Sequence, residues 1–250
     1  MVRNSLTPAM AAPSAKQTPR SNIVVERGAD PSRLIIAFTG FQGALNVPVF
    51  DFLGATGQTD ASRILLRDPL NLLYLSGCWP DARGFSRLLE RLRGEISSLG
   101  PQHITCVGTS SGGYAAILFG HLLGADRVHA FAPTVYGSVW LTLLRGDWQQ
   151  FRRRVMPRHL LVELLIPPRL WKYRDLPRTL QTWNGRTEYT VHVCARNEND
   201  MTRAEPLRGL PHVDIAAHPC STHQVAKYLV RSGELAEVFR SGSPENGVGE

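Results

Sequence analysis

The chain has 250 residues and a formal net charge of +7, which is the size of one ordinary α/β domain. Hydrophobic residues make up 43% and charged residues 20% of the sequence, so the composition excludes a wholly disordered, collagen-like or coiled-coil protein. No stretch approaches the roughly 18 uninterrupted apolar residues of a membrane span, and we expect no integral membrane association. Residues 1–22 lack the apolar centre of a secretory signal. We expect disordered tails at 1–22 and 241–250 on a cytoplasmic protein, with an organelle transit peptide as the alternative for the first segment.

The four cysteines, Cys78, Cys106, Cys194 and Cys220, form no CxxC pair and no Cys/His cluster at the spacing of zinc ligands. Cys106 and Cys194 lie in apolar runs that resemble strands, where a thiol usually behaves as a small hydrophobic group. The sequence therefore predicts buried free thiols in a reducing compartment. It indicates neither a metal nor an organic cofactor.

Apolar, β-rich runs alternate with helical patterns along the chain, which predicts a mostly parallel sheet flanked by helices in one α/β domain at 23–240. The expected strands are 22–28, 33–41, 71–77, 103–108, 127–133, 187–195 and 212–219. Residues 62–68 fit either a strand or the end of a helix. The expected helices are 85–99, a segment after Tyr114, and 221–233, with Ser221 or Thr222 as N-cap and Gly233 as the stop.

The segment 137–186 interrupts this alternation and holds ten Arg and Lys residues against three acidic ones. Its net charge of +7 equals the net charge of the whole chain. Amphipathic helices broken at Pro157, Pro167 and Pro168 are expected here, as an inserted helical lid above the sheet. The run Arg152, Arg153 and Arg154 fits a solvated helix face, the rim of a pocket that attracts an anionic substrate, or a membrane-surface helix. No recognition motif accompanies the basic segment, so we expect no nucleic-acid binding.

The sequence GTSSG at 108–112 has the pattern G-x-S-x-G with Ser110 at its centre. A buried strand precedes it and a helix follows it. A serine on so tight a turn requires neighbours without side chains, because a Cβ at 108 or 112 would clash with the adjoining strand and helix. A serine hydroxyl is a poor nucleophile at neutral pH, so this turn also requires a base and a group that orients the base.

This strand, GTSSGGYAA and the helix after it resemble the nucleophile elbow of the α/β-hydrolase superfamily, over roughly 33–135 and 187–235. The resemblance implies a nucleophile, then an acid, then a histidine in chain order. It assigns Ser110 as nucleophile and Asp200, in the loop past a strand, as the acid, with Glu198 as its rival. It assigns His223 as the base, with His218 as the alternative. The remaining histidines, His129 and His192 among them, are expected to be structural or surface residues.

The same resemblance implies an oxyanion hole made of two backbone N–H groups. One belongs to Ser111, the residue after the nucleophile. The other belongs to Phe41 in the FTGFQG loop, with Gln42 as the next choice and Thr39 where the family usually has histidine. Gln42 and Tyr114 are expected to contact the substrate.

These assignments predict a serine esterase that hydrolyses a carboxylic ester of a small-molecule or acylated substrate, an anionic one in particular, through an acyl-enzyme on Ser110. Two alternatives stay open. One is an acyltransferase of the same fold that passes the acyl group to a hydroxyl or amine. The other is a protein of this fold that binds a ligand without turnover. The sequence leaves the oligomeric state open.

Overall fold

The computed structural model describes residues 21–40, 43, 45–144 and 164–240. Across these residues seven strands form one sheet in the order β1-β3-β2-β6-β7-β8-β9. Only β1 runs antiparallel to its neighbour, and the other strands are parallel. The strands are β1 Ile23–Glu26, β2 Asp30–Phe38, β3 Ala61–Leu66, β6 His103–Thr109, β7 Arg127–Phe131, β8 Glu188–Cys194 and β9 Val213–His218. Two short strands of two residues each, β4 (Gly77–Cys78) and β5 (Ala82–Arg83), pair as a separate hairpin.

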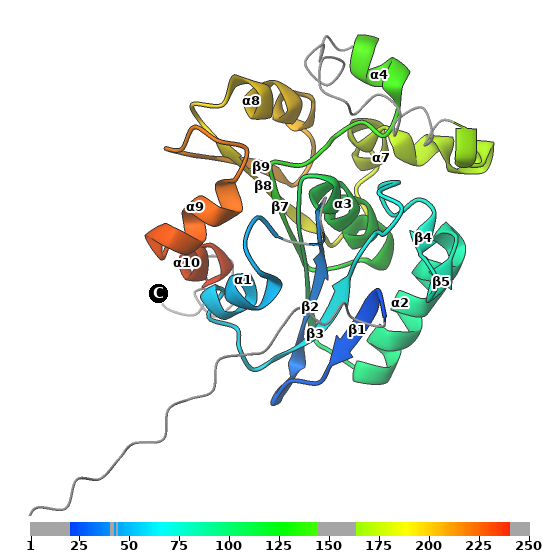
Figure 1. The fold of residues 1–250 in the computed structure, drawn as a ribbon, viewed down its shortest axis with the longest axis vertical. Helices are drawn as coiled ribbons and strands as arrows, with labels where there is room; N and C mark the ends of the chain where they lie inside the picture. The colour runs from blue at the N-terminus through cyan, green and yellow to red at the C-terminus, as the bar shows by residue number, and fades with distance from the viewer. Residues whose placement is uncertain (1–20, 41–42, 44, 145–163, 241–250) are drawn as a thin grey trace, which may run out of the picture.

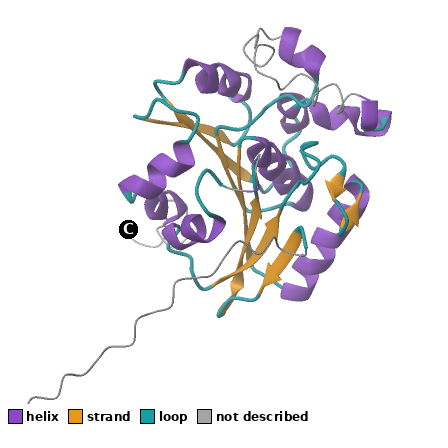
Figure 2. Ribbon diagram, viewed as in Figure 1, coloured by secondary structure: helices purple, strands orange, loops and turns teal. Residues whose placement is uncertain are grey.

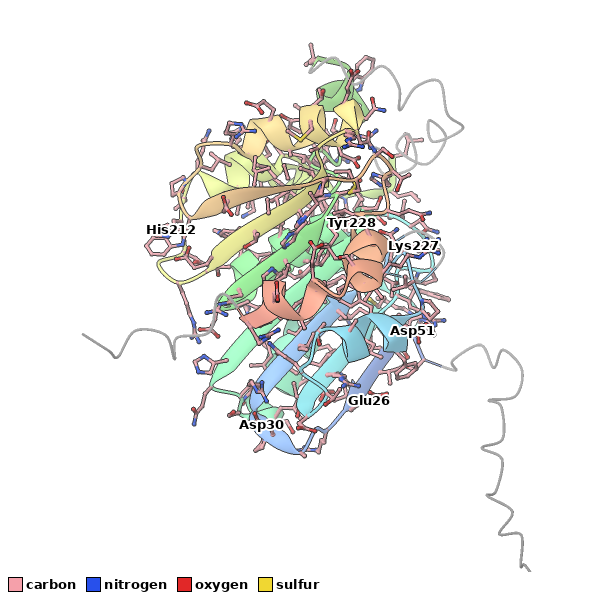
Figure 3. The ribbon with its side chains drawn as sticks, turned by 90° about the vertical axis from the view of Figure 1, so that its left-hand side faces the viewer. Glu26, Asp30, Asp51, His212, Lys227 and Tyr228 are labelled. Atoms are coloured by element: carbon pink, nitrogen blue, oxygen red, sulfur yellow. A yellow bond between two sulfur atoms is a disulfide. The ribbon has the colours of Figure 1, made fainter. Side chains whose placement is uncertain are left out.

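Helices cover both faces of the sheet (Figures 1 and 2). One face carries α1 (Val49–Ala55), α9 (Val225–Ser232) and α10 (Leu235–Arg240). Figure 3 faces this layer and shows these helices lying across the strands, with Asp51 labelled on α1 and Tyr228 on α9. The other face carries α2 (Phe85–Leu99), α3 (Ser111–Leu123) and α7 (Leu176–Leu180). The remaining helical segments are α4 Val139–Leu144, η2 Pro168–Arg174, α8 Glu198–Ala204 and η3 Glu205–Leu207.

The apolar run of β2 shows why these segments become strands. Leu34, Ile36 and Phe38 belong to the core that contains α2 and α3, whereas Ile35 and Ala37 belong to the core beneath α1, α9 and α10. Successive side chains of a strand point to opposite faces. A strand with helices on both sides is therefore apolar throughout rather than alternating, and the expected strand at 33–41 is confirmed for Arg33–Phe38.

The expected strand at 71–77 is wrong. Residues 71–76 form turns, in which Asn71, Leu73 and Tyr74 have positive φ values of 53°, 59° and 59°. The run is apolar because its central side chains are buried: Leu72, Leu73, Tyr74 and Leu75 are at most 4% exposed. Burial without strand pairing accounts for the sequence pattern. The segment 62–68, for which the sequence fits a strand or the end of a helix, contains most of strand β3.

The expectation of four free thiols is also wrong, because Cys194 and Cys220 form a disulfide. Cys194 ends β8 and Cys220 follows β9, and these strands are neighbours in the sheet. Residues 26 apart in the sequence are thereby brought within bonding distance. Cys78 and Cys106 are free and buried. The expectation of a reducing compartment depended on free thiols, and the disulfide removes that basis.

The basic segment 137–186 is described only at its two ends, which contain α4, η2 and α7. The arginines at 152–154 lie outside the described residues, as do residues 1–20 of the expected tail at 1–22 and the expected tail at 241–250, whereas Ser21 and Asn22 form hydrogen bonds to Ile23, Asp81 and Arg67. Gly137 donates its backbone N–H to the carbonyl of Arg174 and Leu176 donates to that of Val135, so the two ends of the segment lie together beside β7. In the part of the chain that the structure describes, no helix is long and apolar enough to cross a membrane.

Candidate active site

Ser110 lies on the turn between β6 and α3, with φ of 53° and ψ of −115°. Positive φ is unusual for a residue with a side chain and is found at functional turns. The flanking glycines make this turn possible. A Cβ on Gly108 would lie 2.1 Å from the Gly112 carbonyl oxygen, and a Cβ on Gly112 would lie 2.1 Å from the Phe38 carbonyl oxygen. The steric reason given for both glycines is therefore confirmed.

Three side chains from distant parts of the sequence meet at the carboxyl ends of the parallel strands. His223 Nε2 lies 3.2 Å from Ser110 Oγ, and His223 Nδ1 lies 2.7 Å from Asp200 Oδ1. The tautomer with its hydrogen on Nδ1 donates to the carboxylate and leaves Nε2 as an acceptor for the serine hydroxyl. The side chain of Asp200 is 1% exposed and that of His223 is 40% exposed. The carboxylate is thus shielded from water, and the imidazole reaches solvent.

Asp200 lies in the first turn of α8 rather than in the loop expected for it. Asn197 caps this helix, because its Oδ1 accepts hydrogen bonds from the backbone N–H groups of Asn199 and Asp200. The same residue donates from Nδ2 to Asp200 Oδ2 at 2.9 Å. Each carboxylate oxygen of Asp200 therefore has its own partner. Glu198, the rival acid, is exposed on the same turn.

His223 lies in the irregular segment 219–224, two residues before α9 begins at Val225. The expected N-caps at Ser221 and Thr222 are wrong, because Gln224 occupies the N-cap position, whereas Gly233 ends the helix as expected. His218, the alternative base, contacts His192 instead, with its Nε2 3.1 Å from His192 Nδ1.

The N–H of Ser111 belongs to the first residue of α3, and the first N–H groups of a helix have no acceptor within it. Phe41 and Gln42, the other residues expected to contact the reacting oxygen or the substrate, lie outside the described residues. The strand end before them is firmly held: the Tyr74 hydroxyl lies 2.9 Å from the Thr39 carbonyl oxygen and 3.0 Å from that of Leu66. From the sequence, Tyr74 and the other aromatic residue of 67–84 are expected either to pack around a turn or to line a substrate pocket, and the hydrogen bonds of the Tyr74 hydroxyl are not predictable from that pattern.

Tyr114, which is expected to contact the substrate, is buried within the protein. Its side chain is fully buried on α3, and its hydroxyl donates to the backbone carbonyl of Tyr173. Burial raises the pKa of Tyr114 above its ordinary value, because the phenolate would lose its hydration. The residue connects α3 to the segment that contains η2, so its role is packing. Across the described residues, no group of three or more His, Cys, Asp or Glu side chains could hold a metal ion.

No family model matches the chain, and no curated protein sequence matches it. Solved structures do. A thermophilic esterase from Thermogutta terrifontis has a TM-score of 0.52 at 14% identity, covering 90% of this chain and 94% of the esterase. The capsule O-acetyltransferase of Neisseria meningitidis serogroup A has a TM-score of 0.57 at 14% identity, covering 87% and 90%. MGS-MChE2, an α/β-hydrolase enzyme from a lagoon-sediment metagenome at Mar Chica, has a TM-score of 0.52 at 15% identity, covering 92% and 98%. The protein has the α/β-hydrolase fold.

Proposed function

We propose that this protein is a serine hydrolase that cleaves a carboxylic ester through an acyl-enzyme on Ser110. The observation that carries the proposal is the continuous contact from Ser110 Oγ through the His223 ring to the buried Asp200 carboxylate. A base within hydrogen-bond reach of the serine, itself oriented by a third group, is the arrangement that nucleophilic catalysis requires. The similarity to esterases in fold is consistent with this chemistry, although a fold alone does not determine an activity.

In the proposed reaction, Ser110 Oγ attacks the acyl carbon while its proton passes to His223 Nε2. Asp200 stabilises the imidazolium that forms and holds the ring in the productive tautomer. The N–H of Ser111 donates to the developing oxyanion, at the positive end of α3. The proton on His223 then passes to the leaving alcohol. A water molecule that His223 deprotonates releases the carboxylic acid and restores the serine hydroxyl.

An acyltransferase is the second candidate, because the O-acetyltransferase from Neisseria meningitidis has the same fold. Both reactions proceed through the same acyl-enzyme, and they differ in whether water or another hydroxyl or amine attacks it. Burst kinetics with an activated acetyl ester separate the two. If a hydroxyl or amine acceptor accelerates the second phase and yields the acylated acceptor instead of free acid, the protein is a transferase.

The basic segment 137–186 leads us to propose that the substrate is anionic. Four cationic side chains of its described part, Arg169, Lys172, Arg178 and Arg186, are exposed, and Arg186 forms an ion pair with Asp126. Positive potential near a site raises the local concentration of anions and is screened by salt. A carboxylated ester should therefore have a higher kcat/KM than a neutral ester of equal length, and the difference should shrink at high ionic strength. We also propose that this segment covers the site as a lid.

A fluorophosphonate probe tests the enzyme against the ligand-binding alternative, because it reacts covalently with an activated serine. The wild-type protein should be labelled on Ser110, and Ser110→Ala should abolish labelling. Ser97→Ala, which changes an exposed serine on α2, is the matched control and should be labelled like the wild type. A folded wild-type protein that the probe does not label would contradict an activated serine and favour a protein that binds a ligand without turnover.

A further inference from the structure

The disulfide between Cys194 and Cys220 joins the two chain segments that lead to the acid on α8 and to the base in the irregular segment 219–224. Cys194 is the last residue of β8, six residues before Asp200 in α8. Cys220 follows the last residue of β9 by two positions and precedes His223 by three. The covalent bond therefore joins the two chain segments immediately before the carboxylate and the imidazole.

Backbone hydrogen bonds continue this connection toward the acid. Ala195 and Arg196 donate their backbone N–H groups to the carbonyls of His218 and Cys220, at 2.8 and 3.0 Å. Asn197 then donates its backbone N–H to the Cys194 carbonyl at 2.9 Å. Its side chain accepts a hydrogen bond from the backbone N–H of Asp200 and donates one to the carboxylate of Asp200. Asn197 thus connects the acid to the disulfide, because it contacts both Cys194 and Asp200.

The base depends on the disulfide more directly, because residues 219–224 form neither helix nor strand. Cys220 donates to the His218 carbonyl at 2.7 Å and accepts from Arg196. Beyond it the side chain of His223 is 40% exposed, so packing restrains the imidazole less than it restrains the buried carboxylate. A crosslink at Cys220 limits how far the segment that carries this ring can move from α8.

We propose that Cys194 and Cys220 are positioning residues for the catalytic site: their disulfide sets the alignment of His223 with Asp200, and breaking it slows the attack of Ser110. The proposal builds on the proposed function. Cys194 is fully buried, whereas Cys220 is partly exposed, so Cys220 Sγ is the sulfur that a reductant reaches. With dithiothreitol, one reagent thiolate attacks this sulfur and releases the Cys194 thiolate. The second reagent thiol then displaces Cys220, giving two protein thiols and the cyclic disulfide of the reagent.

The test uses the full chain in a Cys78→Ala, Cys106→Ala background, which removes both buried free thiols and keeps the disulfide. Hydrolysis of p-nitrophenyl acetate is measured before and after dithiothreitol, with alkylation and mass spectrometry to count thiols. Because a displacement of about 1 Å in a catalytic group can cost on the order of 100-fold in rate, kcat should fall roughly 10- to 100-fold while KM changes little. Reoxidation should restore kcat. Cys194→Ala with Cys220→Ala should give the same low kcat without any reductant.

A second measurement, by proton NMR, tests the alignment of His223 with Asp200 without depending on ester hydrolysis. The His223 Nδ1–H that faces Asp200 should give a low-field proton NMR resonance, assigned by its loss in Asp200→Asn. Reduction should broaden or abolish this resonance at a temperature well below the midpoint of thermal unfolding. If reduction lowers only that midpoint and leaves kcat and the resonance unchanged, the disulfide is a stabilising crosslink and the proposal is wrong. Isolation of the protein with four free thiols would also overturn it.

These outcomes are separable from the failure of the proposed function. If the oxidised protein neither hydrolyses esters nor reacts with a fluorophosphonate, the catalytic proposal fails. The effect of reduction on the low-field resonance then still decides whether the disulfide aligns the imidazole with the carboxylate.

Discussion

Asp200 and Glu198 lie two residues apart on the first turn of α8, yet their carboxylates have different surroundings. Asp200 is buried and contacts His223 and Asn197, whereas Glu198 is exposed to water. The sequence predicts both as candidates, because either carboxylate follows β8 at a distance from which it can reach an imidazole. The direction in which each side chain leaves the helix decides between them, and that direction depends on the Asn197 cap that starts α8.

Replacing Asp200 by Asn should lower kcat on the order of 10³- to 10⁴-fold, because an amide neither stabilises the imidazolium nor enforces the required tautomer. KM should change far less. Glu198→Gln is the matched control, with the same loss of charge on the same helical turn, and should keep kcat within about twofold. Steady-state kinetics on an activated ester measure both variants. The opposite ranking would make Glu198 the acid.

At the scale of an element, the β6–α3 turn is the part of the chain whose sequence and geometry agree most closely. Its glycines, its serine with positive φ and the helix that follows are all required by the tight passage from strand to helix. The neighbouring run 71–77 shows the opposite case. Its apolar residues resemble a strand, but residues 71–76 form turns with positive φ at three positions, and the Tyr74 hydroxyl contacts the backbone where β2 and β3 end.

Gly112→Ala should destabilise the protein by about 3 kcal/mol or more, because the new Cβ would overlap backbone atoms of Phe38 and Thr39 that cannot move away cheaply. Gly94→Ala is the control: this glycine lies inside α2 with no atom within 4 Å of the new Cβ. It should stabilise the protein by about 0.5–1 kcal/mol through helix propensity. Chemical denaturation gives both free energies of unfolding. Equal effects of the two substitutions would contradict the steric argument.

At the scale of the molecule, a row of histidines crosses three neighbouring strands beneath α9 and α10. His129 Nδ1 lies 3.1 Å from His192 Nε2, and His192 Nδ1 lies 3.1 Å from His218 Nε2. Burial lowers the pKa of His129 to about 4, with a smaller contribution from Arg127, and burial also lowers the pKa of His192 well below its ordinary value. These rings are therefore neutral in the folded protein, where each can donate one hydrogen bond and accept another.

Stability should therefore fall as the pH is lowered from about 6.5 to about 4. In this window the unfolded chain protonates His129 and the folded protein does not, so the free energy of unfolding rises with pH. Asp68 opposes this trend, because burial raises its pKa to about 6 and the folded protein then binds the extra proton. The comparison of variants removes that contribution. His129→Gln should reduce the difference in unfolding free energy between pH 7 and pH 4.5 by about 2 kcal/mol.

The control for this experiment is His103→Gln, which replaces an exposed histidine at the start of β6. Its unfolding free energy is measured at the same two pH values, so that a change in pH dependence found with His129→Gln and not with His103→Gln is assigned to the buried ring. If His129→Gln leaves the pH dependence unchanged, the imidazole of His129 is not held neutral by the fold.

From the sequence we predict most of the parallel strands, the turn at Ser110, and two candidates each for the acid (Asp200, Glu198) and the base (His223, His218). Those features depend on local steric requirements and on periodic burial, which a linear pattern records. The tertiary structure alone decided that Cys194 bonds to Cys220, that Tyr114 packs against Tyr173, and that His129 and His192 share a row of hydrogen bonds. Each of these depends on which strands and helices become neighbours, because contacts between distant segments form only when the sheet and its covering helices assemble.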